Sequence, residues 1–271
     1  MRRAVVKSAA RALEVLELFN EQRRALKLHE IYEHLDYPQS SATHLMKSMV
    51  SLGYVNYNPV MRTYVPTGKV KGLGSWLASS MSGHAHYRRL VDTLQERTDE
   101  TVALSTQNDL FIQYFIIRAP EHEFKLPPSE GNMLLLTQST SGMAILSKMA
   151  DRQIDKLVRH INYYEADGGA RVDIAQVMRE LRWVRQVGYC YDEKRPDPRV
   201  LSVAFPLEET LHGIPLALGV GGLTDRISRN ISDIVATIRE TIEEFRERID
   251  ASEEPGFDGL ELIETELSSA A

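Results

Sequence analysis

In the first 66 residues, three short runs with helical spacing of apolar residues are followed by two strand-like runs, an order that few small folds have. Apolar residues recur at helical spacing in three runs, residues 7–19, 28–35 and 38–52. Two short runs rich in Tyr and Val follow within residues 54–65, on either side of a turn at Asn58 and Pro59. Ser8 can cap the first helix, and Gly53 is placed to end the third. Three helices and a two-stranded ribbon, in this order, predict a winged helix-turn-helix.

The third helix presents short hydrogen-bonding side chains in a basic part of the chain. No acidic residue occurs between Asp36 and Asp92, and residues 1–75 hold 11 Lys and Arg against six Asp and Glu. Such a surface can enter the major groove of DNA, while Lys47 and Arg62 suit phosphate or minor-groove contacts. The candidate DNA-binding residues are Gln39, Ser40, Ser41, Thr43, His44, Lys47 and Arg62. A polar helix face can also be merely solvated, but the helices, the hairpin and the local charge together favour DNA.

The rest of the chain is acidic and mixes helices with strands. Residues 76–271 hold 21 basic against 32 acidic side chains. Apolar periodicity predicts helices at residues 84–97, 139–149, 152–161, 172–187 and 225–248. Apolar and β-branched runs predict strands at residues 102–106, 110–118, 134–136, 200–207 and 214–220. Strands in two clusters with helices between them indicate an α+β domain with an antiparallel sheet.

Two segments outside these domains have their own composition. Residues 69–81 are mostly apolar and can form a linker helix whose apolar side needs a partner. That partner can be a second copy of the chain or the chain's own second domain, and the residues leave both open. Residues 250–271 contain seven acids and no base, so we expect a solvated tail without a function of its own.

Several chemistries find no support in the sequence. No run approaches the roughly 18 consecutive apolar residues of a membrane span, and no signal peptide is recognisable. The single cysteine, Cys190, excludes an internal disulfide and a multi-thiolate zinc site, and fits a reducing cytosol. His84 and His86 stand at i and i+2, which point apart on a helix. Neither Ser141 nor Cys190 lies in a nucleophile motif, and the glycines within residues 219–222 lack the Lys and Ser or Thr of a phosphate loop. We therefore expect no catalytic set and no cofactor.

Short motifs spread over residues 4–246 resemble one known family. In the N-terminal part they are Ser8-x-x-Arg11-Ala12-Leu13-x-x-Leu16, Leu28-x-x-Ile31, Tyr37-Pro38-x-Ser40-Ser41-x-x-x-Leu45 and Leu52-Gly53-Tyr54-Val55. Further along they are Gly131-x-x-Leu134, Ser141-Gly142-Met143-Ala144-Ile145-Leu146, Gly188-Tyr189-x-x-Asp192, Ser202-Val203-Ala204-x-Pro206, Leu216-Ala217-Leu218-x-Val220-x-Gly222 and Arg226. In their order they resemble the IclR family of bacterial transcriptional regulators. The resemblance implies a winged helix-turn-helix domain at 1–67, a linker helix at 68–83, a GAF-like effector-binding domain at 84–249 and the acidic tail at 250–271. It favours a homodimer, or a dimer of dimers.

A ligand pocket is the chemistry that the second domain supports best. Thr140 and Ser141 stand where a strand meets the start of a helix, so hydroxyls and free N–H groups can point outward and receive a carboxylate. The resemblance implies an effector pocket lined by Leu134, Thr140, Ser141, Asp192, Ser202, Gly219 and Gly221. The family usually has serine at the last two positions, so glycine there predicts a larger and less polar pocket. Each residue taken alone would also fit ordinary strand and turn packing.

These observations favour a cytoplasmic, homo-oligomeric transcriptional regulator that binds an imperfectly palindromic operator in double-stranded DNA. Its binding would respond to a small organic effector, a carboxylate or aromatic catabolite. The alternative is an enzyme that acts on a small acid and uses the winged helix as an accessory module. The missing acid–base or nucleophile set argues against that enzyme. A purely architectural DNA binder is a third option, and it leaves the second domain without a purpose.

Overall fold

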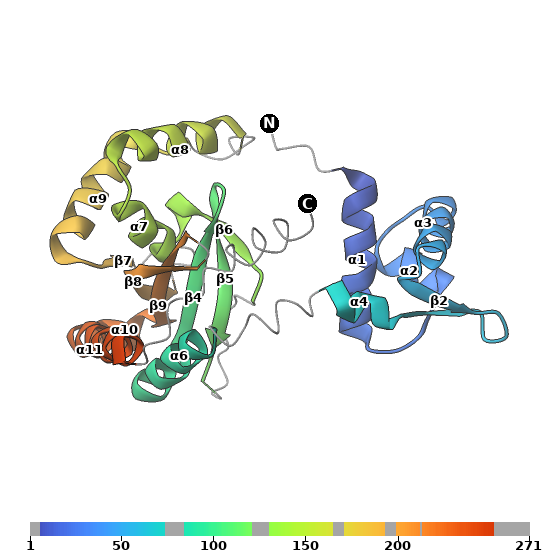
Figure 1. Cartoon of the computed structure of the whole chain (residues 1–271). Coiled ribbons are helices and arrows are strands. Elements are labelled where there is room, and N and C mark those ends of the chain that lie inside the picture. Colours follow the sequence, from blue (N-terminus) through green and yellow to red (C-terminus); the bar gives the residue numbers. More distant parts are fainter. Residues whose placement is uncertain are drawn as a thin grey trace, which may run out of the picture. The chain divides into compact units, whose positions relative to one another are not determined.

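The computed structural model describes residues 6–73, 84–120, 130–164, 171–192, 199–211 and 213–251. The chain divides between residues 81 and 82 into two compact units, each built around its own apolar core (Figure 1). Most of the predicted linker helix, and the acidic tail after residue 251, lie outside the described residues. None of the described helices is both long enough and apolar enough to cross a membrane.

The first unit has the helices and the hairpin that the sequence predicts. Its elements are α1 (Lys7–Gln22), β1 (Leu26–Lys27), α2 (Leu28–His34), α3 (Gln39–Ser51), β2 (Val55–Asn58), β3 (Thr63–Pro66) and α4 (Gly68–Leu73). The strands pair antiparallel in the order β1-β3-β2. Buried side chains from all three long helices and from β2 form the core, among them Val15, Ile31, Met46 and Val55. Most apolar positions expected from the periodicity are buried or half-buried, but Leu13, which was expected on the apolar stripe of the first helix, is 61% exposed.

The ends of the helices in this unit confirm one prediction and correct another. Gly53 has a φ of +77°, and its N–H donates to the Val50 carbonyl at 2.9 Å, so it ends α3 as expected. Ser8 does not cap α1, because the helix begins one residue earlier and Val6 occupies the N-cap without a side-chain hydrogen bond. Glu30 accepts from the Lys27 N–H at 2.7 Å and caps α2. The Arg24 guanidinium, 2.7 Å away, lowers the pKa of Glu30 to about 2.

The second unit is a layered α+β domain. Its helices are α6 (His84–Thr98), α7 (Thr140–Ser147), α8 (Asp151–Tyr164), α9 (Ile174–Val187), α10 (Thr224–Arg229) and α11 (Ile231–Ala251). Its strands are β4 (Thr101–Asn108), β5 (Phe111–Arg118), β6 (Met133–Leu135), β7 (Cys190–Asp192), β8 (Val200–Leu211) and β9 (Ile214–Leu223). The sheet has the strand order β6-β5-β4-β9-β8-β7. Its neighbouring strands are antiparallel, which the sequence predicts. Figure 1 shows α6, α10 and α11 on one face, and α7, α8 and α9 on the other.

The two faces of the central strands carry side chains of different size. Towards α6 and α11, the strands present large apolar residues, among them Val102, Leu104, Val203, Leu218 and Val220. Towards α7, the alternate positions hold small ones, among them Ala103, Ala204, Ala217, Gly219 and Gly221. A short 3₁₀ turn at Leu136–Gln138 (η1) leads from β6 into α7. This face of small residues positions the candidate effector site.

Two predictions about this unit need correction. The helix expected over residues 225–248 is interrupted at Asn230, where α10 ends and α11 begins. The break lets α10 hold Arg226 against Glu100 while α11 packs along α6. The strand β7 was not predicted, because Cys190, Tyr191 and Asp192 show no apolar run. It exists through its pairing with β8, in which Asp192 lies opposite Ser202.

Candidate functional site

The helix α3 presents one exposed face with the groups expected of a DNA-reading helix. Ala42, Met46 and Met49 are buried and fix which face points outward. On the opposite side, four of the predicted DNA-binding residues are exposed, Gln39, Ser40, His44 and Lys47. Ser41 and Thr43 are half-buried, and the Thr43 hydroxyl donates to the Gln39 carbonyl at 2.7 Å. Thr43 therefore has only acceptor capacity left for a base edge.

The hairpin is tied to the end of α3. The Thr67 hydroxyl donates to the Gly53 carbonyl at 2.6 Å. The Lys69 ammonium donates to the Leu52 carbonyl at 2.9 Å and lies 4.5 Å from the centre of the Tyr54 ring. These contacts hold the residues that follow the hairpin, including Lys69 of α4, to the end of α3. Arg62 is exposed near the tip of the hairpin.

The predicted effector residues gather between the start of α7 and the sheet. Ser139 is the N-cap of α7, and its Oγ accepts from the Gly142 N–H at 2.9 Å. The Thr140 and Ser202 hydroxyl oxygens lie 2.5 Å apart and share a hydrogen bond between α7 and β8. Gly221 is opposite Ser202 in the strand register. A β-carbon at Gly219 would lie 3.3 Å from Ser141 Oγ.

The other two predicted effector residues are farther from this centre. Asp192 is in register with Ser202, at the β7 edge of the sheet, and is half-buried. Leu134 lies on β6, the opposite edge strand, where it is in register with Ile112 of β5 and packs against the apolar cluster on the α7 face. At about 4.8 Å per strand, Leu134 lies roughly 14 Å across the sheet from Gly219. A ligand that touches both ends must span several strands.

The start of α7 differs from the sequence prediction in one respect. Thr140 and Ser141 were expected to turn their hydroxyls outward, but both residues are buried, with 3% and 7% of their surface exposed. Their helix lies close to the rest of the domain because Gly142 has no side chain, and a β-carbon there would overlap the Leu136 carbonyl. The anion-binding features are therefore present but face the interior of the domain.

Two polar residues that the sequence did not single out lie close to the same region. Ser105 follows Ala103 on the small-residue face of β4, and Thr137 lies in the turn before α7. Within the part of the chain that the structure describes, neither buried hydroxyl has a hydrogen-bond partner. Tyr114 is opposite Ser105 on β5, and burial raises the pKa of its phenol to about 12, so it stays protonated. A signal for Ser105 was available, since it interrupts the apolar run of its strand.

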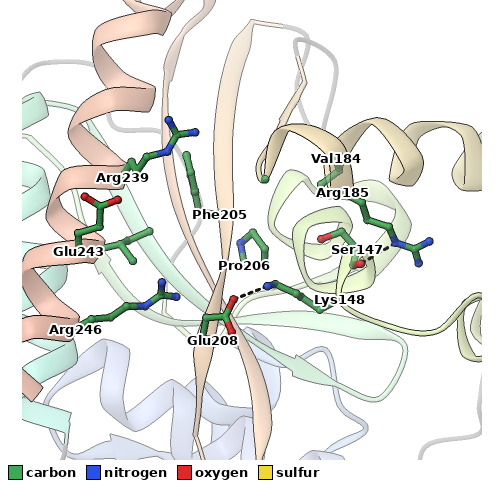
Figure 2. Close-up of a pocket in the computed structure, with 12 residues that line it drawn as sticks. Ser147, Lys148, Val184, Arg185, Phe205, Pro206, Glu208, Arg239, Glu243 and Arg246 are labelled. Carbon is green, nitrogen blue, oxygen red and sulfur yellow. Dashed lines mark hydrogen bonds and ion pairs between the residues drawn. The ribbon is translucent and has the colours of Figure 1, made fainter. Parts of the chain in front are cut away.

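A cavity of about 360 Å³ lies elsewhere in the second unit (Figure 2). It is lined by the ends of α7 and α9, by β8 and by α11, and none of the seven predicted effector residues lines it. Its charged groups are largely paired internally, with Lys148 2.7 Å from Glu208 and Arg246 3.0 Å from Glu209. Arg185 donates to the Ser147 carbonyl at 2.9 Å. We therefore interpret this cavity as a seam between packed elements.

Among the residues that the structure describes, no three His, Cys, Asp or Glu side chains lie close enough together to bind a metal ion. Cys190 is buried in the apolar cluster on the α7 face. His86 lies on α6, and the side chain of His84 is outside the described part.

Comparison with protein families decides the relationship. Residues 8–59 match the IclR helix-turn-helix domain, and residues 78–247 match the C-terminal domain of bacterial transcriptional regulators of the IclR type. This chain belongs to the IclR family. The resemblance seen in the sequence motifs is thereby confirmed, and the protein is a DNA-binding transcriptional regulator with a C-terminal effector domain.

Individual IclR-family proteins align over most of the chain. The transcriptional regulator XynR of Escherichia coli is 23% identical over 230 residues, which cover 82% of this chain and 88% of XynR. The crystal structure of the Thermotoga maritima IclR protein has a TM-score of 0.67 at 19% identity, and covers 90% of this chain and 99% of its own. An IclR homologue from Microbacterium hydrocarbonoxydans, solved with 4-hydroxybenzoate, has a TM-score of 0.66 at 16% identity, with coverages of 90% and 99%. The fold of this chain is therefore the fold of these IclR proteins.

Proposed function

We propose that this IclR-family regulator reads its operator with the exposed face of α3 and senses an aromatic carboxylate between α7 and the sheet. The observation that carries the proposal is the cluster of Thr140, Ser141 and Ser202 over Gly219 and Gly221, at the start of a helix. The exposed face of α3 supports the DNA half of the proposal. Lys47 and Arg62 neutralise phosphates, while Gln39 and its exposed neighbours reach base edges.

The DNA half is tested with single substitutions on α3. Lys47→Ala should weaken binding to all duplexes and reduce the slope of log affinity against log salt by about 0.9, because one phosphate neutralisation is lost. Gln39→Ala should instead change the preferred base at one operator position, with a cost of about 1–3 kcal/mol at that position. The probe is a duplex that the full-length protein enriches from a random library, and the measurement is fluorescence anisotropy at several salt concentrations. Unchanged affinity in both variants would show that α3 is not the reading helix.

The chemistry of the cluster selects the effector. The Thr140 and Ser141 hydroxyls and the first amides of α7 are donors, which suit one carboxylate. The carboxylate would accept hydrogen bonds from the Thr140 and Ser202 hydroxyls, in place of the hydrogen bond that these two share. Asp192 is an acceptor that suits a hydroxyl or amine on the opposite end of the ligand. The unpartnered hydroxyls of Ser105 and Thr137 can bind further polar groups of such a ligand, which relieves the cost of their burial.

The size of the effector follows from the floor of the site. Serine at positions 219 and 221 would add two side chains against Ser141 and Ser202, which lie 3.3 Å and 3.6 Å from where the β-carbons would be. Because glycine leaves these side chains out, we propose that the site suits a flat aromatic body better than a two-carbon acid. The 4-hydroxybenzoate bound to the Microbacterium protein supports an acid of this size and polarity. An aromatic carboxylate with a hydroxyl at its far end fits the hydroxyl cluster, the two glycines and Asp192, and a ligand of this size does not reach Leu134 on β6.

Calorimetric titration tests the effector. We expect binding of 4-hydroxybenzoate or a related aromatic acid to the parent protein, and weaker binding to the double variant Gly219→Ser, Gly221→Ser, by about tenfold for two intruding side chains. Gly68→Ser serves as a matched glycine control, because it lies in α4 of the first unit and no atom lies within 4 Å of where its β-carbon would be. If glyoxylate binds tightly while aromatic acids give no heat, the enlarged site is wrong.

We propose a homodimer, or a dimer of dimers, as the DNA-binding species. The exposed apolar side chains of Val6 and Leu13 on the α1 side of the first unit, and of Leu73 on α4, support a subunit contact there. A symmetric dimer would read an imperfectly palindromic operator. We assign no reaction to the second unit, and place the protein with the chromosome in the bacterial cytoplasm.

A further inference from the structure

The tip of the β2–β3 hairpin carries two adjacent apolar side chains that nothing in its unit covers. Val60 is 87% exposed and Met61 is 63% exposed. Several other large apolar side chains of this unit are exposed, among them Val6, Leu13, Leu52 and Leu73, but Val60 is the most exposed of those in the described part of the chain. Figure 1 shows the turn of the hairpin projecting beyond the helices of the first unit. Two neighbouring apolar side chains at a projecting tip are free to contact a partner.

The backbone holds this tip in one shape. Asn58 Oδ1 accepts from the Val60 and Met61 N–H groups, each at 3.0 Å. Arg62 follows in the left-handed region with a φ of +53°. Below the turn, the Tyr57 and Tyr64 rings pack with centroids 4.8 Å apart. The two apolar side chains are therefore presented outward by a preorganised turn.

The charge around the tip indicates its partner. Arg62 is adjacent to Met61, and no acidic residue occurs in the sequence between Asp36 and Asp92. An apolar pair beside a cation suits the minor groove of DNA, where apolar side chains wedge between base steps and cations meet the negative potential. A protein partner or a second copy would not need a surface free of acids.

The length of the hairpin fits the same partner. It begins directly after α3 and spans four residues per strand, which is roughly 13 Å before the turn. With α3 in the major groove, the neighbouring minor groove lies about half a helical turn away, roughly 17 Å. The turn residues supply the remaining reach.

We infer that Val60 and Met61 form an apolar wedge that enters the minor groove beside each half-site and opens a base step. This inference rests on the proposed docking of α3 in the major groove. It adds a second source of specificity, because flexible pyrimidine–purine steps open more easily than stiff A-tracts. The operator should therefore favour flexible steps at positions that α3 does not reach.

The test is the double variant Val60→Ser, Met61→Ser in the full-length protein. The probe is a duplex enriched from a random library by the parent protein, with a dye at each end. We expect affinity to fall about tenfold, the size of one lost specificity contact, and the bend measured by energy transfer to decrease. The salt dependence should stay unchanged, because no charge is removed. Arg62→Ala should give a slope smaller by about 0.9, because one cation is removed.

Three further measurements make the outcome decisive. Met133→Ser, which removes a side chain that is 42% exposed on β6 of the second unit, should leave affinity and bend unchanged. A second duplex replaces the flexible base step next to each half-site, where the wedge would enter, by an A-tract. The affinity of the parent protein for this duplex should fall, and the affinity of the double variant should not change. Sedimentation should give the same oligomeric state for the parent protein and for the Val60→Ser, Met61→Ser variant.

Each contrary result has a separate meaning. A straight duplex in the parent complex, or unchanged affinity in the double variant, would overturn the wedge. If Lys47→Ala still weakens binding in that case, α3 remains the proposed DNA-reading helix. A change in oligomeric state would overturn it by making the tip a subunit contact. If Lys47→Ala and Gln39→Ala also have no effect, the proposed interface itself fails.

Discussion

Replacing Gly142 by alanine should destabilise the second unit by about 3 kcal/mol, near the upper end for overpacking. The added β-carbon would overlap backbone atoms of Leu136, including its carbonyl oxygen, and backbone cannot rotate away as a side chain can. All eight residues of α7 are buried, so a shift of this helix disturbs both the core and the effector cluster. Urea-dependent hydrogen exchange, measured on peptides of the second unit, gives the free energy of unfolding.

Gly221→Ala is the matched control for this substitution. A β-carbon at Gly221 would have its nearest neighbour at 3.6 Å, which is ordinary contact, so we expect a change within about 0.5 kcal/mol. The Gly142 variant should also lose aromatic-acid binding but keep its affinity for DNA. Equal stability of the two variants would mean that Gly142 does not set the distance between α7 and the turn before it.

Replacing Arg226 by alanine should cost the second unit about 2 kcal/mol. Glu100 is 3% exposed and accepts two hydrogen bonds from the Arg226 guanidinium, whose pKa is raised by this carboxylate. Removing the cation leaves a buried carboxylate unpaired, which costs roughly 3–5 kcal/mol for a fully buried pair. We expect less because the Arg226 side chain is 41% exposed and water can reach the site.

A second substitution separates the charge from the packing. Adding Glu100→Gln to Arg226→Ala should restore at least half of the lost stability, because a neutral amide is less costly to bury than a carboxylate. The same urea-dependent exchange measures both proteins. A double variant less stable than Arg226→Ala would show that the two side chains contribute through packing and not through charge.

The sequence predicted those elements whose local pattern matches their final environment. The helices of the first unit were predicted because each buries apolar residues in a single core. The hairpin was predicted from its Tyr- and Val-rich runs and its turn, and only Val55 of its strands is buried. Ser8 was assigned as a cap because serine favours that position, but α1 begins at Lys7, before it. The interruption at Asn230 was missed because the apolar spacing continues through it.

The candidate effector site was predictable as a set of residues but not in its geometry. The register of β8 and β9 places Ser202 opposite Gly221, and sequence alone gives no register for such strands. The burial of the Thr140 and Ser141 hydroxyls depends on how closely α7 approaches its neighbours, which is a tertiary property. Ser105 and Thr137 were missed for the same reason, since only packing reveals that their hydroxyls lack partners.

The unequal faces of the central sheet have a consequence for how such a regulator diversifies. On β4, β8 and β9, one set of alternate positions holds the large apolar side chains that stabilise the domain, and the other set holds Ala, Ser and Gly under α7. A mutation in the second set can alter which molecule is sensed without removing a core side chain. Duplicated copies of the gene could thus acquire new inducers one methyl or hydroxyl at a time, while each intermediate remains folded.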